Sequence, residues 1–218
     1  MFRGPCVLGA ALLLGGLIGP AVSQAGSQLE EPLADAVRSA LSVAISSDDR
    51  SRLVLSQAGL QATRDAWVQK QWPVLTTKLR RASLPGWRHE WGPVDLQREL
   101  LENVWYEATR ARLEPELVLG LIEVESDFRK FAVSSAGALG LMQVMPFWGR
   151  LLADVPPRHL FHLQTNLRFG CVILRHYLDR EQGDLTMALG RYNGSRGQTT
   201  YANAVLSARA RWVSGHQP

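Results

Sequence analysis

The sequence predicts an all-α protein, and three observations lead to this fold class. Apolar residues recur with helical spacing in most segments after residue 30. No segment shows the convincing alternation of apolar and polar residues that a half-buried strand requires. Six helical segments follow one another within about 120 residues of the C-terminal part, which is typical of one compact helical domain.

Two helices are expected ahead of residue 93. The first covers residues 31–45, and its apolar stripe has i, i+4 spacing and consists of Leu33, Val37, Leu41 and Ile45. The second covers residues 64–79 and should be disturbed by Pro73, because proline removes a backbone donor from the helix interior. A stretch rich in Gly, Pro and Trp at residues 83–93 then indicates a domain boundary.

The C-terminal helices are assigned from capping signals as well as from periodicity. Asp95 is a plausible N-cap for the first of them, and Asp184 can cap the fifth. Pro115 suits the first turn of the second helix, because proline is well tolerated at that position. A loop of small residues is expected at 127–139. The helices themselves are expected at 95–112, 115–126, from 146, at 166–180, 185–192 and 199–212.

The first 25 residues have the pattern of a secretory signal peptide. One positive charge at Arg3 precedes a glycine-interrupted apolar core that ends at Ile18, and small residues fit cleavage after Ser23 or Ala25. The alternative is an uncleaved anchor, but the core is shorter than the roughly 20 residues of a spanning helix, and Pro20 closes it. We expect a soluble periplasmic protein without a stable membrane anchor.

The charge balance favours an anionic partner. The chain has 24 Lys and Arg against 20 Asp and Glu, a net charge of +4 and a pI near 9.4. The arginines are scattered, and no zinc-finger or RNA-binding motif is present. For an exported protein, the cell-wall polymer is therefore a better partner than nucleic acid.

Cysteine and histidine content predicts neither disulfide nor metal chemistry. Cys6 leaves with the signal peptide, and Cys171 then stands alone in an apolar segment, where a thiol behaves as a small hydrophobe. His159 and His162 are three residues apart with His176 nearby, but no cysteine or acidic ligand accompanies them. We expect no metal and no cofactor.

One carboxylate falls on an apolar helix face. In the helix at 115–126, periodicity places Glu125 with Leu121 and Ile122, whereas Glu123 falls on the opposite, solvent side. Apolar surroundings raise the pKa of a carboxyl group, and a general acid near neutral pH needs a raised pKa. Spacing alone leaves the alternative of a helix-end glutamate that faces solvent or pairs with a buried arginine.

Ordered sequence blocks resemble the soluble lytic murein transglycosylase (SLT) domain family, which has a lysozyme-like helical fold similar to that of goose-type lysozyme. The resemblance covers about residues 96–212. One departure concerns the loop after the last block, where many members read Tyr-Asn-Ala-Gly and this chain reads Tyr192-Asn193-Gly194-Ser195. The blocks are Glu125-Ser126-Asp127-Phe128 with 132–138, Gly140-Leu141-Met142-Gln143-Val144-Met145-Pro146, Asn166-Leu167-Arg168-Phe169-Gly170 and 188–194.

The resemblance implies a catalytic domain at 94–218. The residue patterns place a helical N-terminal region at 26–93 and the signal peptide at 1–25 ahead of it. It implies cleavage of the β-1,4 bond between N-acetylmuramic acid and N-acetylglucosamine in peptidoglycan glycan strands, with a 1,6-anhydromuramic end as product. Glu125 would act first as acid and then as base. The substrate's 2-acetamido carbonyl would replace the second carboxylate of ordinary glycosidases, and Asp127 lies on the wrong helix face for that role.

The resemblance also assigns supporting roles. Ser134 matches the serine that contacts the muramyl N-acetyl group, and Met142 and Gln143 match substrate-lining positions. Met142 alone would be taken for a core residue. Tyr192 matches the tyrosine that hydrogen-bonds the catalytic carboxyl group, and Asn193 shapes the turn behind it.

Some alternatives stay open. A lysozyme-type hydrolase would cut the same bond with water, and a non-catalytic module would only bind the wall. Phe147 and Trp148 form either a sugar-stacking platform or ordinary packing. Three tryptophans of the N-terminal region form either a surface that docks on the catalytic domain or a private core, and they are Trp67, Trp72 and Trp87.

Overall fold

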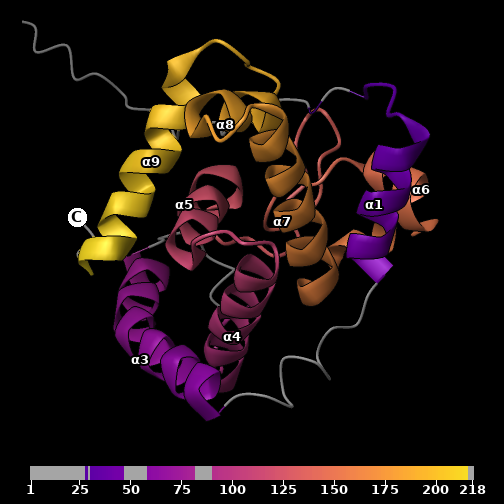
Figure 1. The fold of residues 1–218 in the computed structure, drawn as a ribbon. Coiled ribbons are helices and arrows are strands. Elements are labelled where there is room, and N and C mark those ends of the chain that lie inside the picture. The colour runs from indigo at the N-terminus through magenta and orange to yellow at the C-terminus, as the bar shows by residue number, and fades with distance from the viewer. Residues whose placement is uncertain (1–27, 29, 47–57, 82–89, 216–218) are drawn as a thin grey trace, which may run out of the picture.

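The structure is a computed structural model that describes residues 28, 30–46, 58–81 and 90–215. These residues form eight α-helices, a short 3₁₀ helix and no sheet (Figure 1), so the predicted all-α fold class is confirmed. The signal peptide, Cys6 and Trp87 lie outside the described residues. The elements are α1 (Asp35–Ser46), α3 (Ala58–Arg81), α4 (Val94–Arg110), α5 (Pro115–Ser126), α6 (Pro146–Ala153), η2 (Pro157–Phe161), α7 (Leu163–Arg180), α8 (Leu185–Asn193) and α9 (Thr199–Ser214).

Several helix ends differ from the predictions for local reasons. The N-cap of α4 is Pro93, and Asp95 lies in the first turn instead. The helix α3 runs through Pro73 without a break, because buried side chains on both sides of the proline hold it in place. The first helix begins only at Asp35, since Pro32 favours an extended conformation for the residue before it.

Other local signals are confirmed. Pro115 opens α5, and Asp184 caps α8 by accepting a 3.0 Å hydrogen bond from the Met187 amide. The segment from Asp127 to Leu139 contains no helix. No helix among the described residues is long and apolar enough to cross a membrane.

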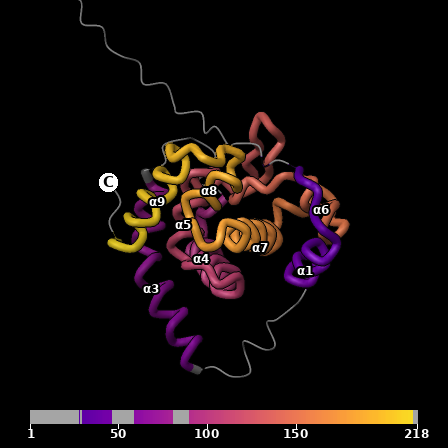
Figure 2. The backbone as a smooth tube through the Cα atoms, turned by 45° about the horizontal axis from the view of Figure 1, so that its top comes forward, coloured from indigo at the N-terminus to yellow at the C-terminus, as the bar shows by residue number. Residues whose placement is uncertain are grey.

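The helix α5 lies at the centre of the C-terminal part, with α4, α7, α8 and α9 arranged around it (Figures 1 and 2). Eight of its twelve residues are buried. Gly120 allows the close approach of α9, because a Cβ atom at this position would stand 2.6 Å from the backbone nitrogen of Arg209. Any side chain here would push the two helices apart.

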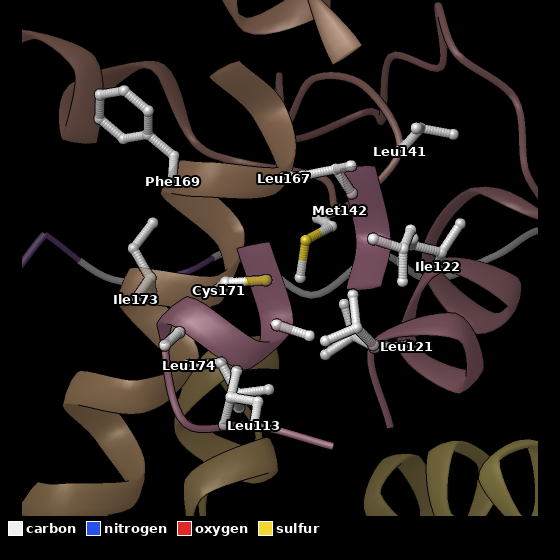
Figure 3. Packing of buried hydrophobic residues seen from close by; sticks show 14 of the residues in the cluster. Leu113, Leu121, Ile122, Leu141, Met142, Leu167, Phe169, Cys171, Ile173 and Leu174 are labelled. Carbon is white, nitrogen blue, oxygen red and sulfur yellow. The ribbon is translucent and has the colours of Figure 1, made fainter. Parts of the chain in front are cut away.

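The core between α5 and α7 is apolar and contains the thiol of Cys171. Figure 3 shows Cys171 and Met142 among leucine and isoleucine side chains of both helices. Cys171 is free and 1% exposed, and burial raises the pKa of its thiol well above the usual value. The predicted burial of Cys171 in an apolar segment is therefore confirmed.

The helix α3 packs on the C-terminal part and shares its core. Val68 and Leu75 belong to the same hydrophobic cluster as the residues of α5 and α7. The indole nitrogen of Trp67 donates a 2.8 Å hydrogen bond to Glu116 in the first turn of α5. Trp67 is thus a docking residue. The domain division at residue 93 remains a prediction.

A buried carboxylate joins α4 to α7. The Glu107 side chain has no exposed surface, and Arg168 donates to both of its oxygens at 3.1–3.3 Å. Arg110 lies 3.8 Å from the second oxygen. Removal of a buried carboxylate between two guanidinium groups strongly destabilises the fold, because the removal leaves the positive charges uncompensated.

We predict that Glu107→Ala lowers the free energy of unfolding by about 3–5 kcal/mol. Urea unfolding followed by circular dichroism measures this change. Glu99→Ala, on the exposed face of the same helix, is the matched control and should stay within about 0.5 kcal/mol of wild type. Equal losses in the two variants would contradict the role assigned to Glu107.

Candidate active site

Glu125 is a buried carboxyl group at the end of α5. It is the penultimate residue of the helix and is 4% exposed, as its helical periodicity predicted. Burial raises the pKa of Glu125 to about 8, and a hydrogen bond from Tyr201 works against this increase. The group therefore holds a proton at neutral pH and can still lose it at moderate cost.

Tyr201 is the partner of this carboxyl group, and the sequence reasoning missed it. Its hydroxyl group donates a 2.5 Å hydrogen bond to Oε1 of Glu125 from the first turn of α9. Burial raises the pKa of Tyr201, and the Glu125 charge raises it further, so the phenol stays protonated. A signal was present, since Tyr201 shares a helical face with Val205, Ala208 and Trp212, all buried.

The Tyr192 hydroxyl group directs its own proton to the adjacent loop. Its hydroxyl group donates a 2.7 Å hydrogen bond to the carbonyl of Met142. A phenol has a single O–H, so this proton is not available to Glu125. Burial raises the pKa of Tyr192, and the nearby Glu125 charge adds to the increase. Tyr192 is therefore a neighbour of the carboxyl group that supports the adjacent loop, while Tyr201 donates to Glu125.

The loop from Gly140 to Gln143 is held from inside by its own side chains. Met142 is fully buried and packs against Gly170 of α7, and its amide donates a 2.8 Å hydrogen bond to Asn166. Gln143 is 4% exposed and donates at 2.8 Å to the carbonyl of Gly140. In this structure both predicted substrate-lining side chains shape the loop and expose almost no surface to a glycan.

Glycine is required where this loop meets α7. Gly140 has φ +75°, a conformation that side chains rarely adopt, and a Cβ atom here would overlap the Asn166 side chain. The Asn166 amide donates to the carbonyls of Leu139 and Leu160 at 2.9 and 2.7 Å. The asparagine of the third sequence block therefore fixes the loop backbone.

Ser134 lies in the turn ahead of this loop, and Asn193 lies at the end of α8. The Ser134 hydroxyl accepts a 3.0 Å hydrogen bond from the Ala138 amide, which leaves its own proton available for a ligand. Asn193 is the last residue of α8 and is 7% exposed. Gly194 follows in the left-handed conformation and ends the helix. The shifted glycine of this chain thus serves as the C-cap.

Glu123 corrects another prediction, because it does not face solvent. Its side chain is 8% exposed and accepts hydrogen bonds from Lys78 of α3 and from Arg211 and Trp212 of α9, at 3.2, 2.8 and 2.8 Å. Periodicity separated it correctly from Glu125. It could not show that α3 and α9 cover the opposite face of α5. Asp127 lies on this same face and pairs with Lys78 at 3.0 Å.

The remaining aromatic and histidine candidates contact one another through their rings. Phe147 and Trp148 are 6% and 2% exposed, and their rings pack 5.1 Å apart, so ordinary packing is the correct alternative. The rings of His159 and His162 stack at 5.2 Å. Within the described residues, no three histidine, cysteine or acidic side chains gather as potential metal ligands.

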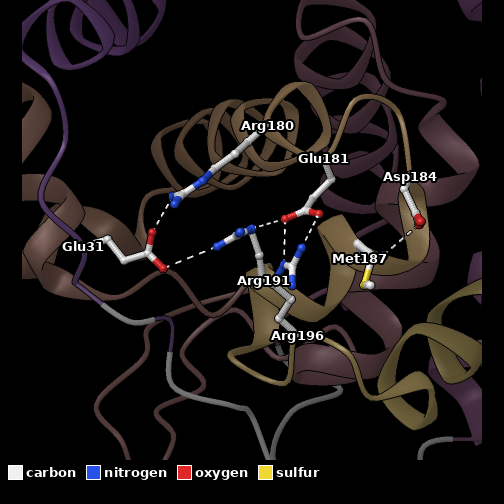
Figure 4. A network of polar contacts seen from close by, with 7 residues as sticks. All are labelled: Glu31, Arg180, Glu181, Asp184, Met187, Arg191 and Arg196. Atoms are coloured by element: carbon white, nitrogen blue, oxygen red, sulfur yellow. Dashed lines mark hydrogen bonds and ion pairs between the residues drawn. The ribbon is translucent and has the colours of Figure 1, made fainter.

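A network of ion pairs holds the connection from α8 to α9, which leads to Tyr201 (Figure 4). Arg196 of this connection donates to Glu181 at 2.9 and 3.0 Å, and Arg191 of α8 donates to the same carboxylate. These hydrogen bonds, that of Arg196 first, lower the pKa of Glu181 to about 2. Arg191 also pairs with Glu31, as does Arg180, which ties the N-terminal segment to α7 and α8.

Comparisons with known proteins place the chain among lytic transglycosylase sequences. The family described as "Transglycosylase SLT domain" matches residues 102–213, slightly more than half of the chain. A transglycosylase of Enterobacteria phage PRD1 is 33% identical over 106 residues, which cover 49% of this chain and 38% of that protein. Membrane-bound lytic murein transglycosylase C of Actinobacillus pleuropneumoniae is 53% identical over 49 residues, covering 22% of this chain and 13% of that protein.

Among solved structures, an inactive mutant of the lytic transglycosylase Slt from Pseudomonas aeruginosa is 21% identical. The match has a TM-score of 0.47 and covers 59% of this chain and 27% of that one. The chain spans well under half the length of the curated relatives that it matches.

The raised pKa of Glu125 predicts a pH-dependent gain in stability for Glu125→Gln. The folded pKa of about 8 exceeds the ordinary glutamate value of 4.5, so the native state keeps a proton that the unfolded state loses between these values. The contribution of Glu125 to stability is complete below about pH 4.5 and is lost as the pH rises through about 8. Glutamine avoids this loss. At pH 8 the free energy of unfolding of the variant should therefore exceed that of the wild type by on the order of several kcal/mol.

Urea unfolding at pH 5 and pH 8 measures this gain. Glu30→Gln, at an exposed position, is the control and should show the same difference from wild type at both pH values. A Glu125→Gln difference that does not grow between pH 5 and pH 8 would show that the carboxyl group titrates normally.

Proposed function

The chain belongs to the transglycosylase SLT domain family, and from this premise we propose that it is an exported, periplasmic lytic transglycosylase. It cleaves the β-1,4 bond between N-acetylmuramic acid and N-acetylglucosamine of peptidoglycan. The product strand ends in a 1,6-anhydromuramic residue. The observation that carries this proposal is the buried Glu125, which lies in the family's first sequence block and holds a proton at neutral pH.

Glu125 acts first as the acid. Its proton goes to the glycosidic oxygen, the bond between C1 of the muramic residue and that oxygen breaks, and N-acetylglucosamine leaves with a new 4-hydroxyl group. The substrate's 2-acetamido carbonyl stabilises the positive charge at C1. Burial supports this half of the reaction, because it keeps the carboxyl group protonated until the proton is needed.

Glu125 then acts as the base. The muramic C6 hydroxyl attacks C1 of the same sugar, a C1–O6 bond forms, and the hydroxyl proton returns to Glu125. The nucleophile is already in place, so no water is consumed. The Tyr201 hydroxyl group stabilises the carboxylate between the two steps through its 2.5 Å hydrogen bond. Burial and Tyr201 together keep both protonation states accessible.

The surroundings of Asp127 support a mechanism with one carboxylate. A retaining glycosidase uses a second carboxylate about 5–5.5 Å from the first. Asp127 is the nearest acidic residue in the sequence after Glu125, and its side chain pairs with Lys78 on the face of α5 that meets α3. Export is supported by the signal-peptide pattern of the first 25 residues.

The products of peptidoglycan digestion test this proposal. Mass spectrometry of the soluble fragments should show 1,6-anhydromuramic ends for the wild-type protein. Reducing muramic ends without the anhydro product would instead assign a lysozyme-type hydrolase. Glu125→Gln should lose at least about 10²–10⁴-fold in rate, because the general acid is gone. Unchanged glycan solubilisation by this variant would exclude Glu125 as the catalytic residue.

Removal of the Tyr201 hydroxyl group should move the alkaline limb of activity to higher pH. The hydrogen bond from Tyr201 lowers the pKa of Glu125, so Tyr201→Phe raises this pKa above about 8. A hydrogen bond to a charged group corresponds to roughly 1–2 pKa units. The rate at neutral pH should fall, because the carboxylate of the second step is no longer stabilised.

The pH dependence of kcat, measured from pH 5 to pH 10, checks this shift. Tyr106→Phe, on the separate helix α4, provides a matched loss of a phenol hydroxyl group. An alkaline limb that stays in place, or moves to lower pH, would contradict the role of Tyr201.

A further inference from the structure

The chain makes a strained turn immediately after the catalytic helix. Asp127 and Phe128 have φ values of +51° and +63°, and neither residue is glycine. Side chains other than glycine adopt this left-handed conformation infrequently, and two successive residues in it need support from their surroundings. The turn lies in the chain between Glu125 and the loop that carries Ser134. Its geometry therefore fixes the position of this loop relative to Glu125.

The support for this turn comes from residues ahead of the family match at 102–213. The indole nitrogen of Trp91 donates a 2.7 Å hydrogen bond to the carbonyl of Phe128. Trp91 is 3% exposed and Phe128 is fully buried. Lys78 of α3 pairs with the Asp127 carboxylate at 3.0 Å and with Glu123 at 3.2 Å. Each residue of the turn thus has one partner from the N-terminal part.

Two further contacts hold the turn at 127–128 and the residues just after it. Glu90, next to Trp91, accepts a 2.8 Å hydrogen bond from the Lys130 amide. The ring of Phe128 packs against Trp212 of α9 at 5.6 Å. The chain beyond the turn is therefore held on the N-terminal side, while the Phe128 ring is anchored to the helix that carries Tyr201.

We propose that Trp91 and Lys78 are positioning residues for Glu125, which they keep buried at the end of α5 by holding the left-handed turn at 127–128. Neither residue touches the substrate. The inference rests on the proposed catalytic role of Glu125. It assigns a function to α3 and to the segment before α4. The functional unit then extends beyond the catalytic domain predicted at 94–218.

A pair of tryptophan variants separates positioning from general stability. Trp91→Phe keeps an apolar ring and removes the donor to the Phe128 carbonyl. Trp67→Phe is the matched control, because it removes an equivalent 2.8 Å indole hydrogen bond to Glu116 at the opposite end of α5. Each variant loses one contact of the N-terminal part, Trp67→Phe with α5 itself and Trp91→Phe with the turn that follows α5.

We expect Trp91→Phe to lower kcat on soluble peptidoglycan strands by about tenfold. Its alkaline limb should move to lower pH, because water reaches a loosened Glu125 and lowers its pKa. The titratable neighbours Tyr192 and Tyr201 have raised pKa values. The alkaline limb of the pH profile of kcat therefore reports the ionisation of Glu125. Trp67→Phe should stay within about twofold of wild type, with an unchanged profile. Equal effects of the two variants on kcat and on the profile would overturn the inference.

Amide hydrogen exchange provides a second readout that needs no substrate. The Asp127 and Arg129 amides donate to Glu123 and Ser126 at 3.1 Å within the turn. Their exchange should accelerate in Trp91→Phe and in Lys78→Met, and return to the wild-type rate in Lys78→Arg. Unchanged exchange in both variants would overturn the proposal.

The Lys78 variants keep the test decisive if Trp91→Phe does not fold. A wild-type protein without activity on peptidoglycan would refute the proposed function, while the exchange rates would still decide whether Lys78 and Trp91 hold the turn.

Discussion

The removal of the Glu125 carboxyl group from water is the constraint on which the rest of the site depends. Burial favours its protonated form, and the hydrogen bond from Tyr201 favours the ionised form. A carboxyl group without the tyrosine would hold its proton too tightly to act as a base, and an exposed one would have lost its proton at neutral pH. The balance of the two effects allows a single residue to give a proton and take one back.

The fold supplies both effects through the position of α5. This helix is surrounded by others on nearly all sides, so a carboxyl group on its buried face has little contact with bulk water. Because Gly120 has no side chain, α9 packs closely against α5, and α9 carries Tyr201. On the other face of α5, Glu123 meets α3 and α9 and has its charge compensated by Lys78 and Arg211. Two glutamates only two residues apart therefore have opposite electrostatic environments.

The sequence predicted much of this arrangement, and its failures have identifiable causes. Local signals sufficed where the chain itself determines the structure, as at Pro115, at Asp184 and on the buried face that carries Glu125. Glu123 was placed in solvent because periodicity shows which residues share a face and not which helix covers it. Tyr201 was missed because its partner lies 76 residues away in the chain. Tyr192 received its role from resemblance, whereas the single proton of its hydroxyl group goes to the Met142 carbonyl.

The ionisation of Glu125 tests this account most directly. Carbon-13 labelling of the glutamate side chains and NMR titration of the free protein give the pKa of each carboxyl group, with Glu125→Gln identifying the signal. Because it is buried, the Glu125 carboxyl group should titrate with a pKa of about 8. A Glu125 signal that titrates near 4.5 would show that the carboxyl group is solvated, and the account of one residue acting as acid and base would fail.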